Sequence, residues 1–176
     1  MIEYLDIVDE NDNLTGIIKE KQQAHRDGDY HRTAHIWLLN EKKELLLQRR
    51  SPQKSSFPDY WDISAAGHIR CGESVIQGAI RELKEELGVD SQESDYHYLT
   101  RIRFESPCNN EFGYVYLLKT KLKENEFVFR DHEVAEVKYV HYTLLEQMVK
   151  DRADRLIIHK NEEALVFEYI RNNLEK

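Results

Sequence analysis

Residues 67–89 read GHIRCGESVIQGAIRELKEELGV, and this stretch decides the fold. Ser74 followed by Gln77 is a capping-box pair that predicts the start of a helix, and Gly88 predicts its end. Between them, apolar residues recur every three or four positions, which predicts a helix that packs one face on a sheet. These apolar residues are Ile76, Ala79, Ile80, Leu83 and Leu87.

Three glutamates on the same helix point to a metal ion. Glu82, Glu85 and Glu86 lie at i, i+3 and i+4, so their side chains project within a narrow arc of one face. Like charges at this spacing destabilise a helix slightly unless a cation lies between them. A hard divalent cation prefers oxygen ligands, so we expect Mg²⁺ here, with Mn²⁺ as a substitute. Taken alone, however, the EELG motif favours an ordinary solvated helix face.

The residues and their spacing over the whole stretch resemble the Nudix box. Gly67, then Glu73 after five residues, then the run 81–89 after seven more fit the box at every defined position. Fixed gaps over so long a stretch are far more specific than a lone glycine motif. Resemblance to the Nudix hydrolases implies an α/β/α sandwich, in which helices flank a central mixed β-sheet.

The resemblance also implies roles for the residues of the box. Gly67 would bring a bare backbone carbonyl to the metal, beside the carboxylates of the three glutamates. Glu73 and Arg81 would orient these carboxylates without binding the metal themselves. The alternative for this pair is a surface salt bridge, worth less than about 1 kcal/mol.

Nudix hydrolases cleave a diphosphate linkage, typically that of a nucleoside diphosphate linked to another group, by attack of water on phosphorus. Divalent ions neutralise the phosphoryl oxygens, and a glutamate takes the proton of the water. Glu82 is the candidate base inside the box, and Glu111 and Glu133 are candidates on loops. Glu111 otherwise reads as a polar residue at a strand edge. The predicted catalytic residues are therefore Glu82, Glu85, Arg81 and Glu111.

Outside the box, residues 1–145 are similar to the branch of the superfamily that includes isopentenyl-diphosphate isomerase. The likeness lies in HRTAH at 31–35 and in LLLQRRSPQK at 45–54. In the isomerase, basic residues of the second segment hold a diphosphate, and the matching residues here are Arg50 and Lys54. The alternative for these two residues is a solvated basic turn.

The isomerase needs a cysteine beside the glycine of the box, and Ala66 occupies that position. Cys71 and Cys108, which we expect to be free thiols, are not obvious substitutes. The missing thiol favours a hydrolase over an isomerase, and a non-catalytic nucleotide-sensing module is the third alternative. His35 and His68 could bind metal, but isolated histidines on strands are more often packed or hydrogen-bonded.

Alternating apolar runs predict strands on both sides of the box helix. Strands are expected over 4–9, 14–18, 33–39, 44–48, 61–69, 96–104, 112–119 and 136–141. Two further helices are expected over 144–149 and 162–173. Five aromatic residues could stack a nucleobase, although filling the core is favoured for most of them; these are Tyr30, Phe57, Tyr60, Trp61 and Phe112.

Length and composition favour a single domain over residues 1–176. The net charge of -8 argues against binding to nucleic acid polymers, but it is compatible with a small diphosphate substrate. No apolar run is long enough for a membrane span, and the acidic N-terminus lacks a secretory signal, so we expect a cytoplasmic protein. A homodimer is an open option. The leaving group stays open among nucleoside diphosphates or triphosphates, dinucleotides, nucleotide sugars and prenyl diphosphates.

Overall fold

Nine strands form one mixed sheet in the computed structural model, which describes residues 2–106, 109–130, 132–159 and 161–174. The strands are β1 (Tyr4–Val8), β2 (Leu14–Glu20), β3 (Tyr30–Leu39), β4 (Glu44–Arg50), β5 (Trp61–Asp62), β6 (Ala65–His68), β7 (His97–Ser106), β8 (Asn109–Lys119) and β9 (Val134–His141). The α-helices are α1 (Lys21–Asp27), α2 (Val75–Leu87), α3 (Tyr142–Lys150) and α4 (Glu162–Leu174), and short 3₁₀ turns lie at Glu93–Asp95 and Glu124–Glu126.

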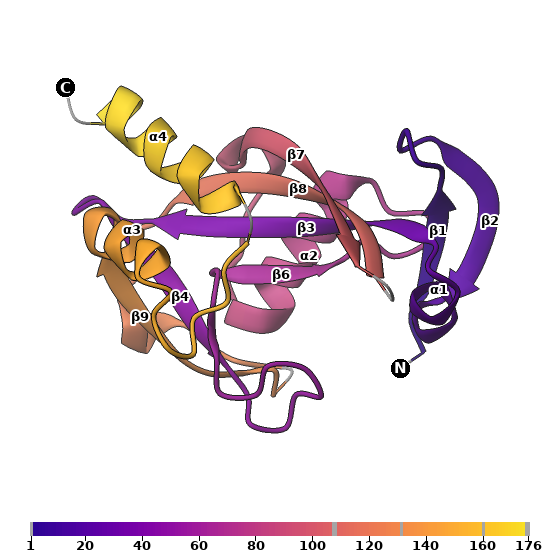
Figure 1. The fold of residues 1–176 in the computed structure, drawn as a ribbon. Helices are drawn as coiled ribbons and strands as arrows, with labels where there is room; N and C mark the ends of the chain where they lie inside the picture. The colour runs from indigo at the N-terminus through magenta and orange to yellow at the C-terminus, as the bar shows by residue number, and fades with distance from the viewer. Residues whose placement is uncertain (1, 107–108, 131, 160, 175–176) are drawn as a thin grey trace.

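Strand β3 pairs with four other strands of the sheet. It pairs antiparallel with β6, from Thr33 opposite His68 to Ile36 opposite Ala65. On its other side it pairs in parallel with β8 along the whole length of β3. Strand β1 joins the start of β3, and β4 joins its end (Figure 1). The parallel pair makes the sheet mixed, which confirms the expected sheet type.

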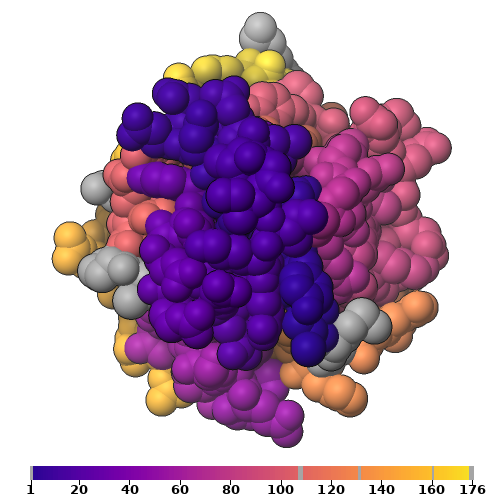
Figure 2. All heavy atoms as spheres, turned by 90° about the vertical axis from the view of Figure 1, so that its right-hand side faces the viewer, coloured from indigo at the N-terminus to yellow at the C-terminus, as the bar shows by residue number. Residues whose placement is uncertain are grey.

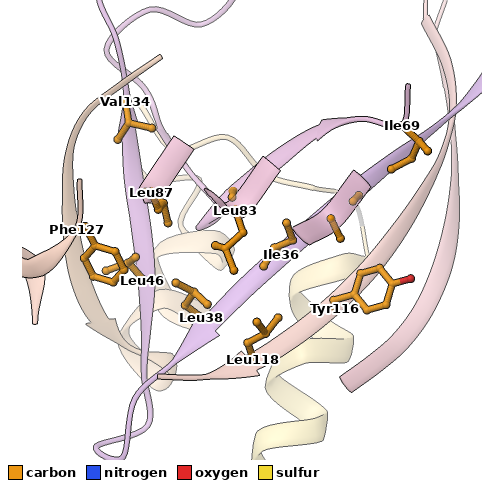
Figure 3. Packing of buried hydrophobic residues seen from close by; sticks show 13 residues of the cluster. Ile36, Leu38, Leu46, Ile69, Leu83, Leu87, Tyr116, Leu118, Phe127 and Val134 are labelled. Atoms are coloured by element: carbon orange, nitrogen blue, oxygen red, sulfur yellow. The ribbon is translucent and has the colours of Figure 1, made fainter. Parts of the chain in front are cut away.

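Alternate residues of β3 enter two separate cores, because successive side chains of a strand point to opposite faces. Ile36 and Leu38 belong to the cluster that includes Leu83 and Leu87 of α2 (Figure 3). Trp37, in contrast, belongs to the cluster that residues of α3 and α4 complete. The sheet therefore lies between α2 on one face and α3 with α4 on the other, and the α/β/α sandwich is confirmed.

Helix α1 is not anticipated by the sequence patterns. Of its seven residues only Ala24 is buried, so the segment carries no apolar stripe. The signal that was present is Gly28, which ends the helix with a φ of 71°.

The strand expected over 61–69 is split into β5 and β6. The Ser64 hydroxyl between them accepts a hydrogen bond from the Leu38 amide (2.8 Å) and donates one to the Leu46 carbonyl (2.6 Å). The Ser64 hydroxyl thus bonds the backbones of both β3 and β4. At this point the chain stops pairing with β4 and begins to pair with β3.

The β1–β2 hairpin covers one side of the molecule, where the N-terminal residues form a continuous surface (Figure 2). Leu14 and Ile18 of β2 are more than half exposed there, at 62% and 54%. Across the described ranges, no helix is both long and apolar enough to cross a membrane. Cys71 is a free thiol as expected, whereas Cys108 lies outside the described residues.

Candidate active site

Helix α2 begins and ends where the capping residues predict. The Ser74 hydroxyl accepts a hydrogen bond from the Gln77 amide (3.3 Å), and the Gln77 side chain accepts one from the Ser74 amide (2.9 Å). Gly88 adopts the left-handed conformation, with a φ of 72°. These two caps fix the register of the helix, and hence the direction in which each glutamate points.

The carboxylate of Glu82 lies directly against the backbone of Gly67. A Cβ atom at position 67 would be only 2.1 Å from Cδ of Glu82, so no residue larger than glycine fits without displacing that carboxylate. Glu82 is 8% exposed, and burial raises its pKa to about 7 despite the nearby charge of Arg81. A bare backbone and a desolvated carboxylate therefore meet at the end of β6.

Arg81 connects the acidic residues of the box. Its Nε and Nη2 atoms donate to the two oxygens of Glu73, at 2.7 and 2.8 Å. Its Nη1 atom lies 2.6 Å from Glu82 Oε1 and 3.1 Å from Glu85 Oε2. Nη2 also donates to the backbone carbonyl of His68 (2.8 Å), which ties α2 to β6. The carboxylates of Glu73, Glu82 and Glu85 thus surround one guanidinium.

The other two glutamates of the triad have different surroundings. The Glu85 side chain is 38% exposed and pairs with Arg70 at 3.0 Å as well as with Arg81. Glu86 is buried at 4% exposure, and its Oε2 accepts a hydrogen bond from Gln48 of β4 (2.9 Å). With Gly67, the triad offers oxygen donors only, which is the donor set that a hard divalent cation takes.

Arg50 lies on the same strand as Gln48, two residues further on, so both side chains leave β4 on the same face. Nη1 of Arg50 is 3.1 Å from Asp62 Oδ2, and Nε donates to the Ser56 carbonyl at 3.2 Å. Nη2 of Arg50 also donates to the Ser56 carbonyl (3.1 Å), so its guanidinium lies between Asp62 and Ser56. Lys54, the other predicted diphosphate ligand, pairs with Glu133.

A second cluster of ligand-type side chains lies on the opposite face of β6. The Nε2 atom of His25 is 3.2 Å from that of His31 and 3.1 Å from that of His68. Glu111, predicted as a possible base, has its Oε1 atom 3.5 Å from His31 and 3.7 Å from His68. Four metal-ligating groups thus converge on one point.

The protonation states of this second cluster suit a metal ion. Burial lowers the pKa values of His68 and His25, which favours neutral imidazoles. Burial alone would raise the pKa of Glu111, but its hydrogen bonds with His31 and Asn109 hold that pKa below its ordinary value. Nδ1 of His31 lies 3.0 Å from the Asp29 carbonyl, a contact that directs the Nε2 lone pair into the cluster.

Sequence reasoning missed this cluster because its members carry no recognisable spacing. His25 comes from the unanticipated helix α1, and it lies 43 residues before His68. In the sequence, His68 is an isolated histidine on a predicted strand. The available signal was the alternation His31, Thr33, His35 on one face of β3.

A third polar group is buried beneath α4. His159 Nε2 is 2.7 Å from Asp62 Oδ1, and His35 Nδ1 is 2.7 Å from Glu162 Oε2. The second oxygen of Glu162 accepts a hydrogen bond from the indole of Trp37 (2.7 Å). His35, also considered as a metal ligand, thus hydrogen-bonds a fully buried carboxylate, and His35, His159 and Glu162 form a second group of side chains that could hold a metal ion.

We expect the pair of His159 and Asp62 to make stability depend on pH. Burial alone would lower the pKa of His159, but Asp62 raises it to about 9, from 6.5. The pair therefore stabilises the fold fully below pH 6.5, and this contribution is lost as the pH rises through about 9. Since each pKa unit is worth about 1.4 kcal/mol, the loss is roughly 3 kcal/mol.

Urea unfolding at a pH of about 6 and of about 10 measures this loss. The wild-type protein should lose roughly 3 kcal/mol more than His159→Leu between the two conditions. Equal losses in both proteins would contradict the assignment. The pKa of Asp62 is lowered to about 2, because this pair outweighs the effect of burial. This shift reflects the same interaction, so it contributes no free energy beyond the roughly 3 kcal/mol of the pair.

The predicted aromatic residues divide between core and surface. Phe112 is buried, and its ring packs at 5.5 Å from that of Tyr30. Trp61 belongs with the core beneath α4. Phe57 is 57% exposed and meets Tyr60 edge to face at 5.5 Å, on the loop that follows Arg50.

Known proteins resemble this chain in sequence along most of its length. Nudix hydrolase 3 of Arabidopsis thaliana is 41% identical over 149 residues, which cover 80% of this chain and 19% of that protein. The chain thus spans about a fifth of that relative's length. An uncharacterized Nudix hydrolase of Clostridium acetobutylicum is 32% identical over 159 residues, covering 86% of this chain and 76% of the relative.

The isomerase branch and a solved structure extend these likenesses. The isopentenyl-diphosphate delta-isomerase of Pectobacterium atrosepticum is 36% identical over 112 residues, which cover 62% of each protein. The crystal structure of DR0079 from Deinococcus radiodurans matches with a TM-score of 0.73 and 26% identity, and covers 93% of this chain and 98% of that one. The sequence pattern of the NUDIX domain matches residues 29–159, and the chain belongs to the Nudix family.

Proposed function

We propose that residues 1–176 fold as one Nudix domain that hydrolyses a diphosphate linkage in a small substrate. The observation that carries this proposal is the contact between Glu82 and Gly67, where a buried carboxylate lies directly against a glycine backbone. The intact pairs of Arg81 with Glu73, Glu82 and Glu85 support the same activity, because they hold the carboxylates in one place.

The donor set of the box fits Mg²⁺ or Mn²⁺, since it consists of carboxylate oxygens and one backbone carbonyl. Glu82, Glu85, Glu86 and the carbonyl of Gly67 would hold the ion. When bound, the ion neutralises phosphoryl oxygens and makes the attack of water easier. Arg50, on the strand that also carries Gln48, the hydrogen-bond partner of Glu86, would bind a phosphate group of the substrate.

Glu82 is the best-supported general base of the three candidates. Its carboxylate lies against Gly67 inside the box and shares Arg81 with Glu73 and Glu85. Glu111 instead faces three histidines, and Glu133 pairs with Lys54. Glu82 would accept the proton of the attacking water from its position at the end of β6.

Release of phosphate or nucleotide products from a substrate panel in Mg²⁺ tests the proposed activity. The panel should contain nucleoside diphosphates and triphosphates, a dinucleoside polyphosphate, ADP-ribose, nucleotide sugars and a prenyl diphosphate. We expect turnover of at least one member. Binding without turnover of any member would favour the nucleotide-sensing alternative and overturn hydrolysis.

The isomerase is the second candidate, because relatives of that branch match the chain and four metal-ligating groups gather at His68. Ala66 opposes it, since an alanine side chain cannot move a proton on carbon. Exchange of solvent deuterium into isopentenyl diphosphate measures this activity. We expect no exchange above the background rate.

We further propose that His25, His31, His68 and Glu111 hold a transition-metal ion. Nitrogen atoms about 2.1 Å from a tetrahedral ion lie roughly 3.4 Å apart, and the Nε2 separations here are 3.1 and 3.2 Å. Three imidazole nitrogens with one carboxylate favour an ion such as Zn²⁺ or Mn²⁺ over Mg²⁺.

Titration with Co²⁺ measures the binding of a metal ion at this second cluster. We expect a visible absorption band in the wild-type protein, and at least about tenfold weaker binding without the band in His25→Asn. His97→Asn, at an exposed position, is the matched control and should behave as the wild type. An unchanged band in His25→Asn would contradict the proposal.

A further inference from the structure

A line of buried charges joins the segment before α4 to Arg50. Asp62 is 4% exposed, and its Oδ2 atom is 3.1 Å from Nη1 of Arg50. Its other oxygen accepts hydrogen bonds from Nε2 of His159 (2.7 Å) and from the amide of Ile63 (2.8 Å). Each oxygen of Asp62 therefore has a cationic partner of its own.

Hydrogen bonds on both sides of His159 fix its position. Residues 155–157 run beside β5, where the Trp61 amide donates to the Arg155 carbonyl (2.7 Å) and the Ile157 amide donates to the Trp61 carbonyl (2.9 Å). After His159, Glu162 is held by His35 and Trp37 beneath the start of α4. Figure 1 shows this segment leaving α3 and returning to α4. His159 is thus a fixed partner for Asp62.

We propose that His159, acting through Asp62, is a positioning residue that keeps the Arg50 guanidinium turned toward the phosphate of the substrate. This proposal rests on the proposed function, because the phosphate ligand of Arg50 comes from there.

The physical reason lies in the geometry that arginine prefers with a carboxylate. Two parallel N–H···O bonds are stronger than one, and Arg50 makes only one such contact with Asp62. His159 occupies the other oxygen of Asp62, and Nε and Nη2 of Arg50 donate to the Ser56 carbonyl at 3.2 and 3.1 Å instead. Without His159, the freed oxygen of Asp62 would draw a second nitrogen of Arg50 away from Ser56 into a two-bond pair, and this turn would change the direction in which the guanidinium faces a phosphate.

The test compares His159→Leu, which removes the N–H donor, with His159→Gln, which keeps an amide N–H. We expect His159→Leu to raise KM, and to weaken the binding of inorganic pyrophosphate with Mg²⁺, by about tenfold. Its kcat should stay within about twofold, because the box is untouched. His159→Gln should recover most of the lost affinity, and His97→Leu should match the wild type.

A double variant separates positioning from a purely structural role. In an Arg50→Gln background, His159→Leu should change KM no further, because the group that it positions is gone. An unchanged KM and pyrophosphate affinity in His159→Leu would overturn the proposal. So would a loss of kcat together with thermal stability that His159→Gln does not restore, since that pattern describes a fold defect.

The same experiment distinguishes failure of this inference from failure of the proposed function. A wild-type protein that turns over no substrate overturns the hydrolase, and the pyrophosphate affinities of the variants then judge the inference alone. If the wild type is active but Arg50→Gln leaves KM unchanged, the inference falls and the hydrolase stands.

Discussion

Replacing Glu85 by glutamine should lower kcat by about 10²- to 10⁴-fold, the range found when a group that acts in the transition state is lost. Glutamine keeps the shape of the side chain but loses the negative charge, and a neutral amide is a poor ligand for a divalent cation. Steady-state hydrolysis of the substrate found in the panel, at several Mg²⁺ concentrations, measures the effect.

The fold should tolerate Glu85→Gln. The Glu85 side chain is 38% exposed, and its pairs with Arg70 and Arg81 lie at the rim of the site. Pairs of this kind contribute less than about 1 kcal/mol, so the midpoint of thermal unfolding should shift by only a few degrees. Glu168→Gln, at an exposed position of α4, is the matched control and should keep full activity. A wild-type rate in Glu85→Gln would remove this residue from the metal site.

The box helix was predictable because its information is local. Capping residues and the 3.6-residue period determine where α2 begins, which face it buries and which residues share the opposite arc. The period alone does not show how deeply each side chain is buried. Glu82 and Glu86 are as buried as many apolar residues, whereas Glu85 is not. The difference arises because Gly67 and Gln48 come from strands that approach the helix from the sheet side.

The histidine cluster and the polar group beneath α4 were not predictable, because both depend on contacts between distant segments. His159 meets Asp62 across 97 residues, and Glu162 meets His35 across 127. No spacing rule connects such positions, and an isolated histidine reads as an ordinary core residue. The split of β5 from β6 at Ser64 depends in the same way on backbone groups of two other strands.

The two faces of β6 have different chemistry. Gly67 turns toward α2 and meets Glu82, while the neighbouring side chains turn to the other face, where Ala66 joins the core beneath α4. His68 joins the histidine cluster on that face, yet its carbonyl accepts a hydrogen bond from Arg81 of α2. A shift of β6 would therefore disturb both candidate metal sites together.

Replacing Gly67 by alanine should lower kcat by about 10²-fold, because displacement of a catalytic group by about 1 Å has an effect of this size. The added Cβ would lie 2.1 Å from Cδ of Glu82, so the carboxylate must leave its place or β6 must move away from α2. Overpacking of this kind should also lower the free energy of unfolding by about 1–3 kcal/mol. Urea unfolding and steady-state rates measure the two effects separately.

A double-mutant cycle with Glu82→Ala shows whether the contact is the cause. Alanine at position 82 removes the Cδ and oxygen atoms that the new Cβ would meet, so Gly67→Ala should then cost little further stability. The expected coupling free energy is about 1–3 kcal/mol. Strictly additive costs would mean that Gly67 is required by the strand itself. A large coupling would identify the close approach of Glu82 as the reason that this position of the box must be glycine.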